Sequence, residues 1–255
     1  MAVVKGPAPV TLASDPRLEP EVVCGRGGRR RGRNGGDVRG ATTLGVRTWG
    51  NDPGGSTLLL MGCYQLRGEV SRRVLDTLPG VIALDPEWWH SPLVPLLAEE
   101  LAVEAPGQQA VLDRLFDLLL VSVLRTWFAQ PHAEVPGWYR AHADPVVGPA
   151  LRLLHEEPAR AWTVATMAAE VGASRSALAR SFSEQVGTTP MAYLRQWRLD
   201  RAADLLLDPG MTLDAIARRA GYSDGSTLSS VFKQDRGLSP SAYRSGVRPL
   251  DVAAP

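Results

Sequence analysis

Small, polar and basic side chains recur in two segments, fifty positions apart, near the C-terminal end of the chain. On a helical wheel of about 100° per residue, centred on Leu178 or Leu228, they lie opposite the apolar face. In the first segment they are Ser176, Ala179, Arg180 and Ser183. In the second they are Ser226, Ser229, Ser230 and Lys233. Because an arginine can donate two hydrogen bonds to guanine O6 and N7, worth roughly 1–3 kcal/mol of discrimination, the pattern favours recognition of DNA bases. Arg180 is the main candidate, with Arg175 beside it.

The two segments belong to a longer repeat in which ten positions match. The first copy is Thr163, Met167, Ala168, Gly172, Ser174, Leu178, Phe182, Gly187, Pro190 and Tyr193. The second copy is Thr212, Ile216, Ala217, Gly221, Ser223, Leu228, Phe232, Gly237, Pro240 and Tyr243. The offset is 49 residues up to the serine and 50 from the leucine onward. Units of this size place one helix in the major groove of DNA.

Each copy is predicted to form a helix, a glycine turn, a second helix, a glycine stop and a third helix. Thr163 and Thr212 can cap the first helix by accepting a hydrogen bond from a free N–H group. The third helix begins with a cap residue followed by proline, which suits the first helical position. The second helices, about residues 174–186 and 224–236, are the predicted recognition helices.

Residues 190–207 are predicted to form one helix that joins the two copies. Such a helix is roughly 27 Å long, and it could set two recognition helices about one DNA turn apart, roughly 34 Å, in successive major grooves. Arg195, Arg198 and Arg201 recur along it. A run of this kind is typical of a solvated face, but beside two recognition helices it favours phosphate contact by Arg195 and Arg198.

At these residues the chain resembles the AraC/XylS family of bacterial transcription regulators, over about residues 145–246. The motifs that carry the resemblance are Ile216-Ala217-x-x-x-Gly221-Tyr222-Ser223, Leu228-Ser229-x-Val231-Phe232-Lys233 and Gly237-x-Ser239-Pro240-x-x-Tyr243-Arg244. The resemblance implies a seven-helix DNA-binding domain with two helices in adjacent grooves. It also implies base contacts from positions 176, 179, 180, 226, 229 and 230.

One departure from the family concerns the second recognition helix. Where the family often has arginine, this chain has Ser230, and Gly225 is expected to weaken the start of that helix. We therefore predict that the two recognition helices contribute unequally to base recognition, so that Arg180→Ala relaxes specificity more than Ser230→Ala.

Composition and charge indicate two folded regions. The chain has 255 residues, of which 44% are hydrophobic and 22% charged, with a net charge of +1. The charge is divided into +4 for residues 1–40, −5 for 41–150 and +3 for 151–248. Two isolated cysteines, Cys24 and Cys63, indicate no disulfide framework. The start lacks a signal peptide's apolar core, and the most apolar stretch is too short for a membrane span. The sequence thus predicts a soluble cytoplasmic protein.

The first half has weaker signals. Residues 1–40 are rich in Gly, Arg and Pro and are predicted to be disordered. Residues 41–144 are predicted to form a partial sensory region, with strands over about 41–85, including a buried strand over 57–66, and helices over about 92–128. Helix 108–128 is apolar on more than one side, which favours internal packing or a homodimer contact. Residues 145–248 form the DNA-binding domain and 249–255 a tail.

Residues 54–144 are similar to the end of the cupin-type sensory domain that precedes many AraC/XylS domains. The residues that match are Leu59-Leu60-Met61-Gly62-Cys63-Tyr64, Leu78-Pro79 and the stretch 138–145. We hypothesise an incomplete barrel, through a shifted start or an altered reading frame. The predicted fold class is therefore mainly α: a double helix-turn-helix domain of about seven helices, preceded by a small partial β segment and a helical hairpin.

Other functions find less support in the sequence. The four histidines, His90, His132, His142 and His155, are scattered and none is paired at metal-ligand spacing, which disfavours a cupin-type metal enzyme. Repair methyltransferases with a similar DNA-binding domain need a reactive cysteine and a zinc cluster, which two isolated cysteines do not provide. We predict no catalytic residues, metal or cofactor. The predicted partner is double-stranded DNA. Further candidate partners are RNA polymerase, a second copy of the chain and a small-molecule effector. The alternative is a protein with a degenerate sensor that binds DNA without an effector.

Overall fold

The computed structural model describes residues 1–6, 9–13, 15, 17–24, 29–38, 43–45, 48–50, 59–62, 68–85, 87, 89–130, 133 and 135–246. The chain forms two compact units. The N-terminal unit comprises Met1–Tyr64 and Pro79–Ala133, and the C-terminal unit comprises Gln65–Leu78 and Glu134–Val252. Within the described residues, no helix is both long enough and apolar enough to cross a membrane.

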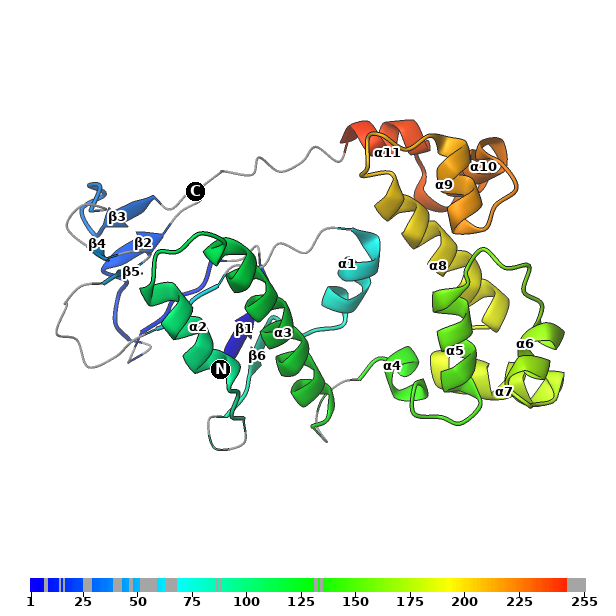
Figure 1. The fold of residues 1–255 in the computed structure, drawn as a ribbon, viewed down its shortest axis with the longest axis horizontal. Coiled ribbons are helices and arrows are strands. Elements are labelled where there is room, and N and C mark those ends of the chain that lie inside the picture. Colours follow the sequence, from blue (N-terminus) through cyan, green and yellow to red (C-terminus); the bar gives the residue numbers. More distant parts are fainter. Residues whose placement is uncertain are drawn as a thin grey trace. The chain divides into compact units, whose positions relative to one another are not determined.

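The described strands of the N-terminal unit form three separate antiparallel pairs (Figure 1). β1 (Ala2–Val4) pairs with β6 (Val81–Ala83), β2 (Val22–Cys24) with β3 (Arg30–Gly32), and β4 (Thr43–Gly45) with β5 (Thr48–Trp49). The prediction of disorder over residues 1–40 is wrong for β1, β2 and β3. β1 and β2 each contain a pair of valines, which favour extended backbone. Segments this short have no apolar periodicity from which their pairing with another strand could be predicted.

The region expected to contain strands from 41 to 85 also differs from the prediction. Of the strand expected over 57–66, residues 59–62 are described; they form no strand, and Leu59 and Met61 are 64% and 63% exposed. Residues 69–76 form a helix, α1 (Glu69–Asp76), and not a strand. A short apolar run does not by itself distinguish a strand from other structure, because its conformation depends on what covers it.

The helical hairpin of the N-terminal unit is present as predicted. α2 (Leu93–Ala102) and α3 (Gln108–Phe128) lie side by side (Figure 1) and bury Leu97, Leu112 and Leu119 between them. The side-chain amide of Gln108 donates to the carbonyl oxygens of Glu100, at 2.6 Å, and of Val103, which closes the turn. Three apolar side chains of α3 remain exposed: Val111, Leu118 and Val121.

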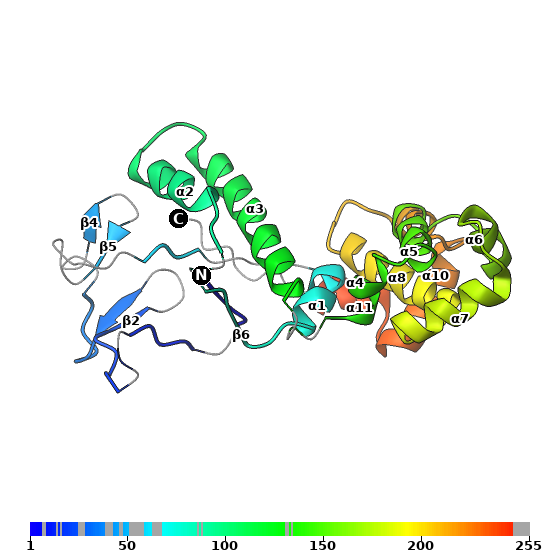
Figure 2. The same cartoon turned by 90° about the horizontal axis from the view of Figure 1, so that it is seen from below.

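The C-terminal unit contains the seven predicted helices, α5 to α11, together with the short helix α4 (Gly137–Ala141) and α1 (Figure 1; seen from below in Figure 2). The seven are α5 (Val147–Glu156), α6 (Val164–Glu170), α7 (Arg175–Val186), α8 (Pro190–Leu205), α9 (Leu213–Ala220), α10 (Gly225–Arg236) and α11 (Pro240–Gly246). The recognition helices α7 and α10 begin one residue after the predicted positions, because the residue before each is its N-cap.

Local signals explain where these helices begin and end. The hydroxyls of Thr163 and Thr212 accept hydrogen bonds from the N–H groups of Thr166 and Ala215, at 3.1 and 3.3 Å. Gly187 and Gly237 follow α7 and α10 with φ of 82° and 74°, a left-handed conformation that glycine adopts without steric cost. The two copies of the motif therefore fold as equivalent modules: α5–α7 with the first half of α8, and α9–α11 with the second half of α8.

Each module has a separate apolar core. The core of the first includes Leu178 and Phe182, and the core of the second includes Leu228 and Phe232; these four side chains are fully buried. The same edge-to-face aromatic pair occurs in both. Phe182 meets Tyr193 at a ring separation of 5.7 Å, and Phe232 meets Tyr243 at 5.4 Å. Matching cores therefore present α7 and α10 in matching orientations relative to their own modules.

Candidate nucleic-acid interface

The outer face of α7 carries the polar positions that the helical wheel predicted. Arg175, Ser176 and Arg180 are exposed, and Ala179 and Ser183 are half-buried. Among the described residues, no hydrogen bond or ion pair holds the guanidinium groups of Arg175 and Arg180. Both are therefore available to donate paired hydrogen bonds to an acceptor outside the protein, such as a guanine edge or a phosphate.

The outer face of α10 is oriented in the same way but has different chemistry. Ser226, Ser230 and Lys233 are exposed and Ser229 is half-buried. The hydroxyl of Ser230 donates to the Ser226 carbonyl oxygen at 3.1 Å, within the helix. A base edge would therefore compete with a bond that Ser230 already makes.

The N-cap of α10 adds a negative charge at the start of this helix. Asp224 accepts a hydrogen bond from the Thr227 N–H group at 2.8 Å, and this bond, followed by one from the Ser223 hydroxyl, holds the pKa of Asp224 below its usual value. A carboxylate stabilises the helix dipole but repels phosphate. The first module has a neutral cap, Ser174, in the equivalent place.

Gly225 has a structural role that the sequence prediction missed. It is buried, and its N–H group donates to Asp214 of α9 at 2.7 Å. A Cβ atom at this position would lie 2.9 Å from the Asp214 carboxylate and 3.1 Å from Leu213 Cγ. Glycine at this position lets α9 and α10 approach closely, and the Asp214 bond satisfies a first-turn N–H group; that it weakens the start of α10 stays a prediction.

Of the two connector arginines predicted to contact phosphate, only Arg195 is exposed. Arg198 is half-buried and points inward. Its Nε donates to the Pro158 carbonyl oxygen at 2.7 Å and its Nη2 donates to that of Arg160 at 2.8 Å. Burial lowers the pKa of Arg198. The prediction for Arg198 is corrected: it binds the loop between α5 and α6 to α8, and the three-residue spacing could not reveal carbonyl partners about forty residues away.

The structure also identifies two exposed arginines that sequence reasoning missed. Arg218 and Arg219 lie in the last turn of α9, the first helix of the second helix-turn-helix, and both are exposed. In helix-turn-helix proteins this helix crosses the DNA backbone. The equivalent residues of the first module are Ala169 and Glu170. Comparison of the two copies at non-matching positions would have revealed this difference in charge.

The histidines of the first module are structural. His155 Nε2 lies 2.8 Å from the Tyr193 hydroxyl, and the His155 ring lies 4.2 Å from the Trp197 ring. Burial, followed by the positive charges of His142, Arg73 and Arg201, lowers the pKa of His155 to about 4. Within the described part of the chain, no three His, Cys, Asp or Glu residues are grouped as metal ligands.

Two similar helix-turn-helix modules, each with an exposed polar recognition helix and joined by a helix, define a DNA-binding protein. Comparison with known proteins agrees. A helix-turn-helix domain model matches residues 167–246, and a Cupin model matches residues 1–129. A putative AraC-like transcription regulator of Streptomyces lividans is 34% identical over 243 residues, covering 93% of this chain and 75% of the relative. The chain therefore belongs to the AraC-like transcription regulators and carries a cupin domain.

Other similar proteins cover less of the chain or of the relative. A putative AraC-like transcription regulator of Streptomyces antibioticus is 34% identical over 195 residues, which cover 75% of this chain and 64% of the relative. The solved DNA-binding domain of AdpA, in complex with a target DNA, is 29% identical and covers 42% of this chain and 95% of that chain, with a TM-score of 0.38. The Cupin match begins at residue 1, so the similarity to a cupin is not limited to residues 54–144 as predicted.

Proposed function

We propose that the chain regulates transcription by binding a specific double-stranded DNA site, with α7 and α10 in successive major grooves and with the first module providing most of the base discrimination. α8 has 16 residues and is therefore roughly 24 Å long, which is compatible with recognition helices about one DNA turn apart, roughly 34 Å. The observation that carries the proposal is the exposed guanidinium of Arg180 on α7. The matching face of α10 offers serines, one of which is already hydrogen-bonded.

The second module contributes mainly through phosphate contacts in this proposal. Arg218, Arg219 and Lys233 are exposed around its helix-turn-helix, and Arg195 is exposed on the connecting helix. Such contacts are independent of base sequence and raise affinity in a salt-dependent way. In this proposal the first module provides most of the sequence specificity, and the second module contributes mainly to the affinity for DNA.

The test is to select binding sites for the purified chain from random duplexes and to measure affinities for every single-base variant of the selected site. Arg180→Ala should lose about 1–3 kcal/mol of discrimination at one or two positions of the half-site that the first module covers. Ser230→Ala should lose less, since its hydroxyl already has a partner. Arg114→Ala, which removes an exposed arginine of α3, is the matched control and should leave the base preferences unchanged. Equal losses for Arg180→Ala and Ser230→Ala would contradict the proposal.

We further propose that a small molecule controls this binding through the cupin domain. The support is the Cupin match over residues 1–129; the effector-binding residues are unassigned. Thermal-shift screening with metabolites tests it, because a ligand that binds the folded state raises the melting temperature. If no metabolite shifts the melting temperature or the DNA affinity, the alternative holds: a regulator that binds DNA without an effector.

The remaining partners follow from the same proposal. The exposed apolar side chains Val111, Leu118 and Val121 of α3 support a homodimer through this helix, which sedimentation of the Leu118→Glu variant would test. RNA polymerase is a candidate partner at the promoter. The proposed role involves no catalytic step, with support from relatives that are transcription regulators, and it places the chain in the cytoplasm, with the chromosome.

A further inference from the structure

The helix α1 belongs to the C-terminal unit although its sequence lies within the Cupin match. It packs against α8 (Figure 1). Along the chain, residues of the N-terminal unit both precede and follow this segment, because Tyr64 and Pro79 belong to that unit. A helix of eight residues from the sensory sequence is therefore tethered at both ends to the N-terminal unit while it docks on the DNA-binding fold.

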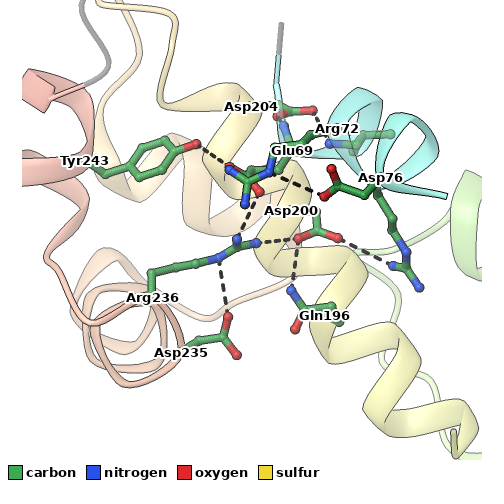
Figure 3. Close-up of polar contacts among 11 residues, drawn as sticks. Glu69, Arg72, Asp76, Gln196, Asp200, Asp204, Asp235, Arg236 and Tyr243 are labelled. Carbon is green, nitrogen blue, oxygen red and sulfur yellow. Dashed lines mark hydrogen bonds and ion pairs between the residues drawn. The ribbon is translucent and has the colours of Figure 1, made fainter. Parts of the chain in front are cut away.

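α1 lacks a cap of its own and obtains one from α8. Its N-cap position is Gly68, which has no side chain to accept a hydrogen bond. The carboxylate of Asp204 takes that role, accepting from the N–H groups of Glu69 and Val70 at 2.5 and 3.4 Å (Figure 3). Burial raises the pKa of Asp204, although these two bonds lower it in part. Isolated helices shorter than about 12 residues are marginal in water, so the helical form of α1 depends on docking.

Docking connects α1 to the end of the second recognition helix. The Glu69 carboxylate accepts hydrogen bonds from Arg236, the last residue of α10, at 3.0 Å, and from the Tyr243 hydroxyl of α11 at 3.1 Å (Figure 3). Arg236 also donates to the buried Asp200 of α8 at 2.5 Å. Burial and the charge of Glu69 raise the pKa of Tyr243 to about 12, so its phenol stays protonated as a donor. The Glu69 carboxylate thus links α1 to α10 and α11, and Arg236 in turn bonds to α8.

The interface is polar and therefore reversible. No residue of α1 is fully buried, whereas Glu69, Arg236 and Asp200 have side chains only 12%, 18% and 6% exposed. Shielded ion pairs of this kind impose a defined geometry, but they stabilise little beyond the desolvation that they require. Elements held by few apolar contacts open at low free-energy cost. We therefore expect α1 to detach at a lower free-energy cost than the unfolding of either module core.

The two modules differ in what α1 does for them. Its contact with the first module is the Arg73 guanidinium, which lies 4.7 Å from the centre of the Tyr193 ring. Its contacts with the second module reach α10 and α11 directly through Glu69. On α8, Asp200 and Asp204 bond to α1 and lie about 140° and 180° around the helix from Arg195, which is exposed. Docked α1 therefore leaves the exposed face of Arg195 uncovered.

We propose that α1 is a detachable brace that positions the second recognition helix, and that Glu69 is its main positioning residue. The inference rests on the proposed function for its consequence in DNA binding. With α1 docked, Glu69 restrains the end of α10 through Arg236, in addition to the direct bond from Arg236 to Asp200 of α8, and both modules engage their half-sites. With α1 released, α10 loses this restraint and the second half-site is bound more weakly. Because α1 is tethered at both ends to the sensory sequence, a change there is transmitted to α10 by way of α1.

The test compares Glu69→Gln with Asp76→Asn in the full-length chain. Both remove one carboxylate from α1, but Asp76 is exposed and, among the residues that the structure describes, its one ion pair is with Arg72, at 3.7 Å. Segment-resolved hydrogen exchange is measured first, without DNA. Glu69→Gln should speed exchange in α1 and in the last turn of α10 by about tenfold, with the first module unchanged. Asp76→Asn should leave α10 unchanged.

The second measurement is binding to selected duplexes that carry both half-sites or only the first one. Glu69→Gln should weaken binding to the complete site about tenfold and leave binding to the single half-site unchanged, whereas a merely structural role would weaken both. Glu69→Gln and Tyr243→Phe should be non-additive, because the phenol donates to Glu69. Equal exchange and affinities for Glu69→Gln and wild type would overturn the brace. A wild-type chain that selects no DNA would instead overturn the proposed function, and the exchange measurement would still decide whether α1 braces α10.

Discussion

The two helix-turn-helix modules share a fold but present different surfaces. Their cores contain the same edge-to-face phenylalanine–tyrosine pair and their first helices begin at capping threonines. Outside the cores the first module exposes Arg180 on its recognition helix, whereas the second exposes serines there and two arginines on the preceding helix. Core residues determine where a recognition helix lies, and surface residues determine what it binds. Equal folds therefore do not imply equal contributions to recognition.

The supports of the two modules also differ. The first is held to α8 by Arg198, which binds the carbonyl groups of the loop between α5 and α6. The second is held to α8 by Arg236, which donates to Asp200, and by Arg244, which donates to the Leu206 carbonyl oxygen, and it has an additional support in α1, a segment from far earlier in the chain. The bonds of Arg198, Arg236 and Arg244 are local to the DNA-binding domain, whereas the α1 contacts involve a segment tethered to the sensory sequence. If α1 acts as the proposed brace, a signal from the sensory sequence is expected to act on the second module.

The largest effect that tests this comparison is on module stability. Phe182→Ala and Phe232→Ala each empty a fully buried site, and we expect each to cost about 3–5 kcal/mol in the free energy of unfolding of its own module. Segment-resolved hydrogen exchange in increasing denaturant measures this. The module that carries the substitution should exchange first. The milder variants Phe182→Leu and Phe232→Leu should lose less stability, because they leave a smaller cavity. Simultaneous loss of protection in both modules would show that they fold as one unit.

The next effect concerns affinity. The double variant Arg218→Ala/Arg219→Ala removes two exposed cations from the second module. If both contact phosphate, the slope of log affinity against log salt should fall by about 1.8, with roughly a thirtyfold loss at physiological salt on every sequence. Titrations at several salt concentrations check this. A changed base preference, instead of a uniform loss, would mean that these arginines specify sequence.

Acid should affect the first module more than the second. His155 has a pKa of about 4 when folded, against 6.5 in an exposed chain, because burial disfavours its charged form; the position 49 residues later is Asp204, whose pKa burial raises. The neutral imidazole is favoured in the folded state, so stability is complete above pH 6.5 and decreases as the pH falls toward 4. We expect a loss of about 1–2 kcal/mol, since the ring is only half-buried and solvent screens part of the penalty. In His155→Gln, which keeps a partner for Tyr193, the free energy of unfolding should depend less on pH over this range. An unchanged pH dependence would mean that other titratable groups cause it.

The smallest effect distinguishes the caps of the two first helices. Thr163 and Thr166 form a reciprocal capping box, whereas Thr212 makes a single capping bond to Ala215. Thr163→Ala should therefore cost about 1 kcal/mol and Thr212→Ala somewhat less. Chemical denaturation of each variant, with Thr189→Ala as a cap of the connecting helix, gives the values. A larger loss at Thr212 would show that the second module depends more on its cap than its geometry indicates.

Prediction from the sequence worked best where interactions are local. The caps, the glycine stops and the apolar i, i+4 pairs place both recognition helices within one residue and orient their outer faces correctly. The direction of Arg198 and the need for glycine at 225 were not predicted. Both depend on what a neighbouring element places nearby, which is the Pro158 carbonyl group in one case and the α9 side chains in the other.

The amino-acid sequence by itself determined the two modules, because a helix cap, a turn glycine and a buried face act within a few residues of one another. Only the tertiary structure decided which arginines face outward and that a helix from the sensory sequence belongs to the DNA-binding fold. Asp204 caps α1 from a distance of 135 residues, and Glu69 reaches Arg236 across 167. The sequence has no periodic pattern that connects residues this far apart, because only folding brings their charges together.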